Sequence, residues 1–128
     1  MLTGDAGIEA LNRAADFLHA NGHETKKMNF IQIPHHGSRR NVSTALLNKL
    51  IGASVVYEGN VGSAYVSASK GESDHPRKRV LNAFTRRGYG THSTEGASIG
   101  FRHNFPMKSG WSAVEPHPFY YEVEEESA

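Results

Sequence analysis

Hydrophobic and polar positions alternate along the chain with two different periods, and each period predicts a different element. Apolar residues within 8–18 recur at intervals of three and four, which predicts one buried helix face, and Gly22 is a suitable stop. Residues 28–34, MNFIQIP, alternate with a period of two and predict a strand. Residues 2–5, LTGD, predict the end of a strand that enters a turn.

The same two periods continue through the middle of the chain. A second apolar stripe over residues 46–51 predicts a helix, with Ser43 as its N-cap. Residues 53–58, ASVVYE, are rich in β-formers and predict a strand. Residues 59–73 are rich in Gly and Ser and predict a loop that contains a short strand near Tyr65.

A third helix and two further strands are predicted after residue 74. Pro76 suits the first helical position, which makes Asp74 or His75 the cap. Residues 97–103 and a segment within 111–123 are predicted strands. The alternation of strands and helices predicts an α/β domain with helices packed on a mixed sheet.

Composition narrows the class of protein without naming a function. The chain has 128 residues, enough for one domain with its own core, and 38% of them are hydrophobic. It has no apolar run of about 20 residues, as a membrane helix needs, and no signal peptide is recognised, so the default expectation is a cytoplasmic protein. The absence of cysteine excludes disulfides and thiolate metal sites, and the formal net charge of +1 favours no partner.

Polar residues with metal-ligand chemistry follow the predicted strands. Asp5 is either a helix N-cap or a carboxylate at the carboxyl edge of the sheet, where α/β folds place their sites. His35 and His36 follow a strand, and imidazole is a usual zinc ligand, so a metal or catalytic role competes with a structural one. His75 is either the cap of the third helix or part of the same site.

Basic residues gather beside these histidines. They are either solvated charge or, through the bidentate fork of arginine, ligands for a phosphate. Ser38 lies close to His36 in sequence, but no third member of a hydrolytic triad accompanies it. The basic residues concerned are Arg39, Arg40, Arg77, Lys78 and Arg79.

Taken together, LTGD (2–5), HHGS (35–38) and His75-Pro76 resemble the C-terminal half of metallo-β-lactamase-fold hydrolases. The most similar branch is the domain at the end of bacterial DNA-uptake competence channel proteins. The resemblance covers residues 1–103, and residues 104–128 form a C-terminal extension whose acidic tail is expected to be frayed. The family fold implies an αββα sandwich, of which this chain would be one half, with helices on one face of its sheet.

The resemblance also implies roles for individual residues. Asp5 would bridge two metals, and His35 or His36, with His35 preferred, would be a further ligand of zinc or another divalent ion. His75 would line the pocket, and Ser38 and Arg39 would contact substrate. The implied reaction is metal-assisted hydrolysis of a phosphoester, and a phosphodiester is the expected substrate.

The chain departs from the family at its main metal motif, His-x-His-x-Asp-His, because no His-x-His occurs in it. Only four residues precede Asp5, so the expectation is a fragment of a hydrolase that is inactive alone and holds metal weakly or not at all. A cut piece, a mis-started gene product and a degenerate paralogue remain open. The alternative is a non-catalytic interaction or nucleic-acid-binding module, supported by the basic segments Arg39-Arg40, Arg77-Lys78-Arg79 and Arg86-Arg87. An exposed sheet face predicts a homo-oligomer, unless the aromatic residues of 104–123 cover that face.

Overall fold

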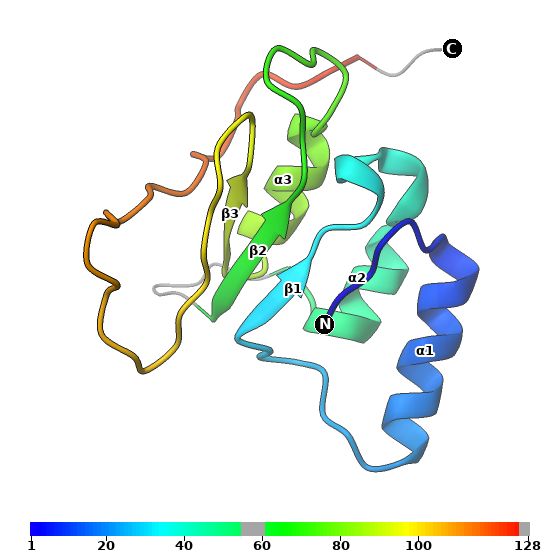
Figure 1. The fold of residues 1–128 in the computed structure, drawn as a ribbon. Helices are drawn as coiled ribbons and strands as arrows, with labels where there is room; N and C mark the ends of the chain where they lie inside the picture. Colours follow the sequence, from blue (N-terminus) through cyan, green and yellow to red (C-terminus); the bar gives the residue numbers. More distant parts are fainter. Residues whose placement is uncertain (55–60, 126–128) are drawn as a thin grey trace.

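The computed structural model describes residues 1–54 and 61–125, in which helices pack against a small parallel sheet (Figure 1). The strands stand in the order β1-β2-β3, and both neighbouring pairs are parallel. Two short 3₁₀ turns separate β1 from the second helix. The elements are α1 (Ile8–Ala20), β1 (Phe30–Gln32), 3₁₀ turns at His35–Gly37 and Arg39–Asn41, α2 (Thr44–Ile51), β2 (Gly62–Val66), α3 (Lys78–Thr85) and β3 (Tyr89–Ser93).

α1 ends where the sequence predicts, and α2 both begins and ends where it predicts. Gly22 follows α1 with a φ of +78°, and its N–H donates to His19 O at 3.1 Å. Ser43 caps α2 because its hydroxyl accepts the N–H of Leu46 at 3.1 Å. Gly52 ends α2 with a φ of +93°, a conformation that favours glycine.

The alternation of side chains divides the sheet into a buried face and an open face. Both connections join parallel strands, and the strand order in the sheet follows the order in the chain. The connecting helices α2 and α3 therefore lie on the same face of the sheet (Figure 1). That face carries the hydrophobic core, whose strand residues Ile31, Ala64, Val66, Tyr89 and Thr91 are at most 1% exposed. The predicted placement of helices on one face is consistent with this arrangement.

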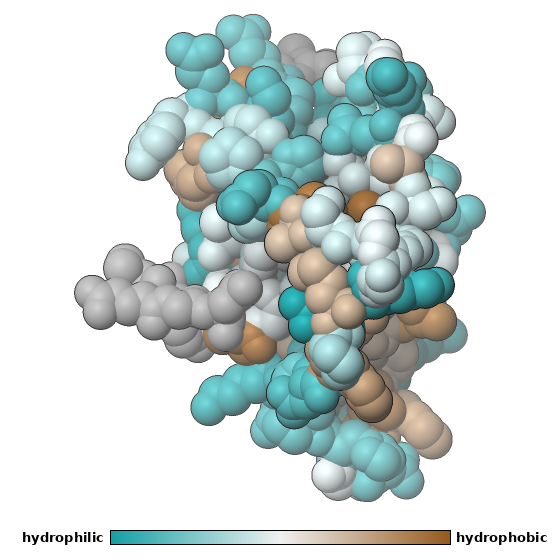
Figure 2. Space-filling view, turned by 60° about the vertical axis from the view of Figure 1, so that its left-hand side comes forward, coloured by the Kyte–Doolittle hydropathy of each residue, from teal (hydrophilic) through white to brown (hydrophobic). Residues whose placement is uncertain are grey.

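Aromatic rings line the open face. The ring of Tyr65 on the central strand lies 5.2 Å from that of Phe30 and 5.1 Å from that of His92, measured between centroids. Phe101 belongs to the segment after β3, and its ring lies against β1, with its centroid 5.0 Å from that of the Phe30 ring. Residues around 101 therefore cover part of this face, and Figure 2, which brings the side of the C-terminal segment forward, shows hydrophobic residues exposed among hydrophilic ones.

The segment before α1 runs beside β1. Met1 N–H donates to Phe30 O at 2.8 Å, and Gln32 N–H donates to Met1 O at 2.9 Å, which is the bonding pattern of a parallel neighbour. The Gln32 side chain accepts from the N–H groups of Thr3 and Gly4. LTGD is thus an extended segment that enters a turn, as predicted, although the segment is too short to form a regular strand.

Several strand predictions are wrong. Residues 97–103 form no strand, and the Phe101 ring lies instead against the open face. No strand forms within 111–123, where hydrogen bonds between the Asn82 side chain and the Tyr120 backbone hold the segment. In contrast, residues 89–93 form β3, which was not predicted, and the described sheet is parallel rather than mixed. The predicted strand at 53–58 falls largely on 55–60, outside the described residues.

The third helix starts two residues later than predicted. Pro76 lies outside α3, and Arg77 with a ψ of 131° is its N-cap, so neither Asp74 nor His75 caps it. Gly7 is the N-cap of α1, so Asp5 is not a cap either. None of the helices within residues 1–54 and 61–125 has the length and apolar run needed to cross a bilayer.

Candidate functional site

The HHGS stretch forms a strained turn at the carboxyl end of the sheet. His35, His36 and Gly37 follow one another with φ values of +47°, +55° and +79°. L-residues avoid this left-handed region at a cost of about 1–2 kcal/mol each. Strain of this kind persists where surrounding contacts hold it, and it gathers at functional sites. Both histidines are exposed.

Gly37 brings the second histidine motif against the first. A Cβ at position 37 would lie 2.6 Å from Pro76 Cβ and 2.9 Å from Pro76 Cα, so only glycine permits this contact. Gly37 O also accepts the N–H of Arg77 at 3.2 Å. These contacts bring His75 beside the HHGS turn, although about forty residues separate them in sequence.

Asn41 fixes the proton position on His35. Asn41 Nδ2 donates to Ala6 O at 3.0 Å and to Asp5 O at 3.4 Å, which turns its Oδ1 toward His35. His35 Nδ1 lies 3.0 Å from this oxygen. Because an amide oxygen only accepts, His35 Nδ1 carries the hydrogen, and the Nε2 of the neutral ring keeps its lone pair.

His36 has the same arrangement with a different partner. Its Nδ1 lies 2.8 Å from Ser67 O, a backbone carbonyl that only accepts. Nδ1–H is therefore the donor, and Nε2 again keeps a lone pair. Both rings thus use one nitrogen to fix their orientation, as metal-ligating histidines usually do. The two ring centroids lie 6.0 Å apart.

The LTGD turn lies against the same site through its backbone. Gly4 O accepts the N–H of His35 at 2.9 Å. The Asn41 side chain donates to the backbone oxygens of Asp5 and Ala6 and accepts from the His35 ring. The Asp5 residue is exposed. The two turns are therefore neighbours, as expected for strand ends at one edge of a sheet, and the role of the Asp5 carboxylate as a ligand stays a prediction.

Five of the six predicted site residues line one pocket of about 650 Å³: His35, His36, Ser38, Arg39 and His75. Its described lining also includes Arg40, Arg77, Arg79, Glu124 and Glu125, but not Asp5. The volume is within the range of small-molecule sites. Ser38 is 8% exposed, and its hydroxyl accepts the N–H of Arg40 at 3.3 Å, so it shapes the turn that presents the neighbouring arginines.

The arginines make the charge of the pocket predominantly positive, and Glu124 also lines the pocket. The Glu124 carboxylate accepts the N–H of Lys78 at 2.6 Å and that of Arg79 at 3.3 Å. Burial alone would raise the pKa of Glu124, but the N–H groups of Lys78, Glu124 itself and Arg79, together with the charge of Arg77, outweigh burial. The Glu124 pKa therefore lies below its ordinary value of 4.5. The prediction of a frayed tail is thus wrong for Glu124.

The donor set fits a metal in part. His35 and His36 offer two oriented imidazole nitrogens, which suit zinc. A catalytic zinc usually has three protein ligands, and the described residues contain no group of three or more His, Cys, Asp or Glu side chains able to hold an ion. The two histidines therefore fit part of a metal site and need further ligands to complete it.

Two residues important to this site were missed by sequence reasoning. Asn41 gave no signal beyond its position after two arginines, and only the fold shows that its buried amide orients His35. Glu124 lies in an acidic run that is typical of a solvated tail. Arg87, by contrast, was grouped with the basic residues, yet it is 4% exposed and its guanidinium bonds Gly52 O, Ala83 O and Asn48 Oδ1.

Comparisons of the chain with protein-family models, with curated proteins and with solved structures each gave no match. The resemblance to metallo-β-lactamase-fold hydrolases therefore depends on the three short sequence motifs alone.

Proposed function

We propose that this chain supplies the phosphoester-facing part of a metal-dependent hydrolase, with remaining metal ligands from outside its 128 residues. One observation carries the proposal. In a single pocket, two imidazoles are fixed with their Nε2 atoms free to bind, beside several arginines. Imidazole nitrogen suits a divalent ion such as zinc, and arginine suits the oxygens of a phosphoester.

Each group in the pocket has a separate task in this proposal. His35 and His36 would hold a divalent ion through Nε2, while Asn41 and the Ser67 carbonyl keep their rings in place. A bound ion would lower the pKa of water and polarise the ester bond. Arg39, whose place at the pocket wall is set by the Ser38 turn, would hold phosphoryl oxygens, and His75 would contact the same ligand.

The alternative of a nucleic-acid-binding module has less support. Its basic residues included Arg87, which is buried and bonded within the core. The arginines that line the pocket surround a concave site, which suits one phosphoryl group better than the continuous phosphate backbone of a nucleic acid. A binding assay with single-stranded DNA separates the two, because salt-dependent binding that survives loss of the histidines would support the alternative.

Zinc titration with NMR of the histidine side chains tests the proposal directly. Before zinc is added, the ring nitrogens of His35 and His36 should show the tautomer with hydrogen on Nδ1. Zinc should then shift both Nε2 resonances with weak affinity, and the isolated chain should not hydrolyse bis-p-nitrophenyl phosphate.

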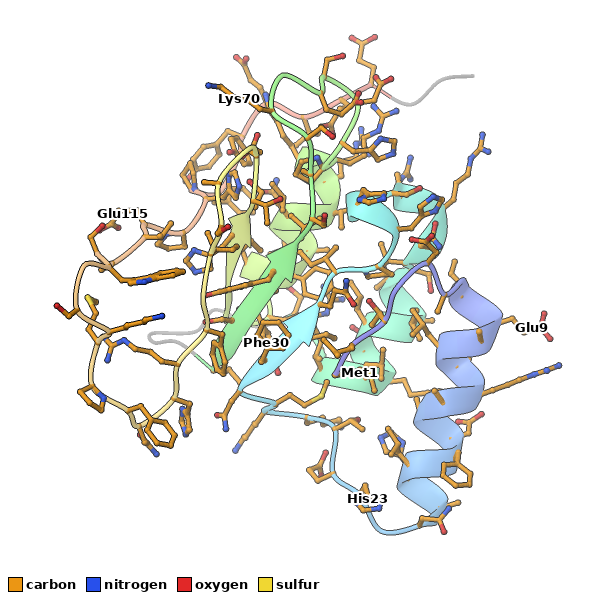
Figure 3. The ribbon with its side chains drawn as sticks, in the orientation of Figure 1. Met1, Glu9, His23, Phe30, Lys70 and Glu115 are labelled. Atoms are coloured by element: carbon orange, nitrogen blue, oxygen red, sulfur yellow. The ribbon has the colours of Figure 1, made fainter. Side chains whose placement is uncertain are left out.

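A matched variant controls for adventitious binding. His35→Ala and His36→Ala should each weaken zinc binding at least tenfold, since about 1.4 kcal/mol of lost coordination is enough for that change. His23→Ala should not weaken zinc binding. Figure 3 shows His23 at the opposite end of the molecule from the loop that carries Lys70, and that loop contacts the HHGS turn through the bond between His36 and Ser67 O. Equal zinc affinity in all three variants would refute a metal site at the HHGS turn.

A further inference from the structure

The segment before the C-terminus carries a carboxylate into the pocket. Glu124 accepts hydrogen bonds from the first two N–H groups of α3, those of Lys78 and Arg79. Its own backbone oxygen accepts from Arg79 Nε at 2.8 Å. The segment thus contributes both a charged and a neutral acceptor to one wall of the pocket.

The Glu124 contacts match those that an anionic ligand makes at a helix N-terminus. Arg77, the N-cap residue of α3, supplies no side-chain acceptor, so the first N–H groups need another partner. These groups and the positive end of the helix dipole favour an anion. Carboxylate and phosphoryl oxygens have the same acceptor chemistry, so the position that Glu124 occupies is also suited to a phosphoryl group.

The segment is attached to the fold in a defined register. The buried Asn82 side chain, 2% exposed, forms a reciprocal pair with the backbone of Tyr120: Asn82 Nδ2 donates to Tyr120 O at 2.7 Å, and Tyr120 N–H donates to Asn82 Oδ1 at 2.8 Å. His117 N–H donates to Thr91 O at 2.8 Å. These anchors lie before Glu124 in sequence, so residues 122–125 can leave α3 while Tyr120 stays in place.

We propose that Glu124 is a built-in competitor for an anion subsite, and that a phosphoryl ligand binds by displacing its carboxylate from the N-terminus of α3. This inference rests on the proposed function for the class of ligand, a phosphoester. The acidic segment 122–125 then regulates access to the pocket. Arg77 and Arg79 remain beside the vacated N–H groups to bind the incoming phosphoryl oxygens.

A charge-neutral variant of Glu124 tests the competition. Inorganic phosphate is titrated into the full chain, and the amide resonances of Lys78 and Arg79 are followed by NMR. Glu124→Gln should bind phosphate roughly five- to thirtyfold more tightly than the native chain, because the competing charge is lost while the side-chain size is kept. Glu115→Gln is an equal change at an exposed residue that does not line the pocket and that Figure 3 shows at the edge of the molecule. It should leave the dissociation constant within about twofold.

Each outcome separates this inference from the proposed function. Tighter binding by Glu124→Gln alone supports competition. Equal dissociation constants in all three proteins would overturn competition while leaving a phosphate site. If none of the proteins binds phosphate, both the subsite and the phosphoester function are refuted.

A second measurement on the native chain does not depend on the variant folding well. Saturating phosphate should reduce the heteronuclear NOE of residues 122–125 as the segment leaves α3, while the value for Tyr120 should stay unchanged. An unchanged NOE across 122–125, with phosphate bound at Lys78 and Arg79, would overturn displacement.

Discussion

Replacing Gly37 with alanine should damage both the stability of the protein and its pocket. A methyl group there would overlap Pro76 and force an L-residue to a φ of +79°. The left-handed backbone costs about 1–2 kcal/mol, and the overlap with a rigid ring and its backbone costs about 1–3 kcal/mol more. The expected loss in the free energy of unfolding is therefore about 2–5 kcal/mol, with Pro76 and His75 pushed away from the HHGS turn.

A matched variant separates the two contributions. Gly71 has the same φ of +79°, but a Cβ there would meet nothing within 4 Å. Gly71→Ala should therefore lose only the backbone contribution of about 1–2 kcal/mol. Urea unfolding followed by circular dichroism measures both variants. If Gly37→Ala loses no more stability than Gly71→Ala, the close contact between Gly37 and Pro76 does not hold the two histidine motifs together.

Two further predictions concern the histidines. His36→Gly should be about 1–2 kcal/mol more stable to urea than His36→Ala, because both variants lose the ring and only glycine accepts a φ of +55° without strain. A greater stability of the alanine variant would contradict the strained turn. Burial, and then the charge of His117, lowers the pKa of His92 below its ordinary 6.5, so its stabilising contribution is complete above pH 6.5 and is lost as pH falls through the lowered pKa. The urea midpoint of the native chain should therefore fall more between pH 7.5 and pH 5 than that of His92→Phe, and equal falls would contradict this assignment.

The helices were predictable because their signals are local. Ser43 and Gly22 each occur where a helix begins or ends, and the apolar stripes of α1 and α2 mark the faces that the core buries. The place of the histidine pair at the carboxyl end of β1 was predictable for a similar reason, because it follows a recognisable strand. The same sequence could not reveal the tautomers, which depend on Asn41 and Ser67 at positions that only the folded chain brings close.

The errors concentrate after residue 88, where contacts distant in sequence decide the structure. Phe101 belongs to an apolar stretch that would suit a strand, but the open sheet face uses its ring as a cover. In β3, glycine lowers the strand signal at Gly90, yet pairing with Ser63 on the central strand makes this segment an edge strand. Glu124 looks solvated in a charged run, and only the N-terminus of α3 gives it a partner.

The parallel pairing of the described strands has a consequence for how the chain folds. Phe30 pairs with Ser63, and Gly62 pairs with Tyr89, so each ladder closes a loop of roughly thirty residues before any bond between strands forms. No two-residue hairpin joins these strands, and no such local nucleus can start the sheet. Folding should therefore proceed with helix docking and strand pairing in one step, more slowly than in a helical bundle of equal length. The strained HHGS turn contacts both Gly4 and Pro76, which lie on either side of it in the sequence, so we expect it to form late in that step.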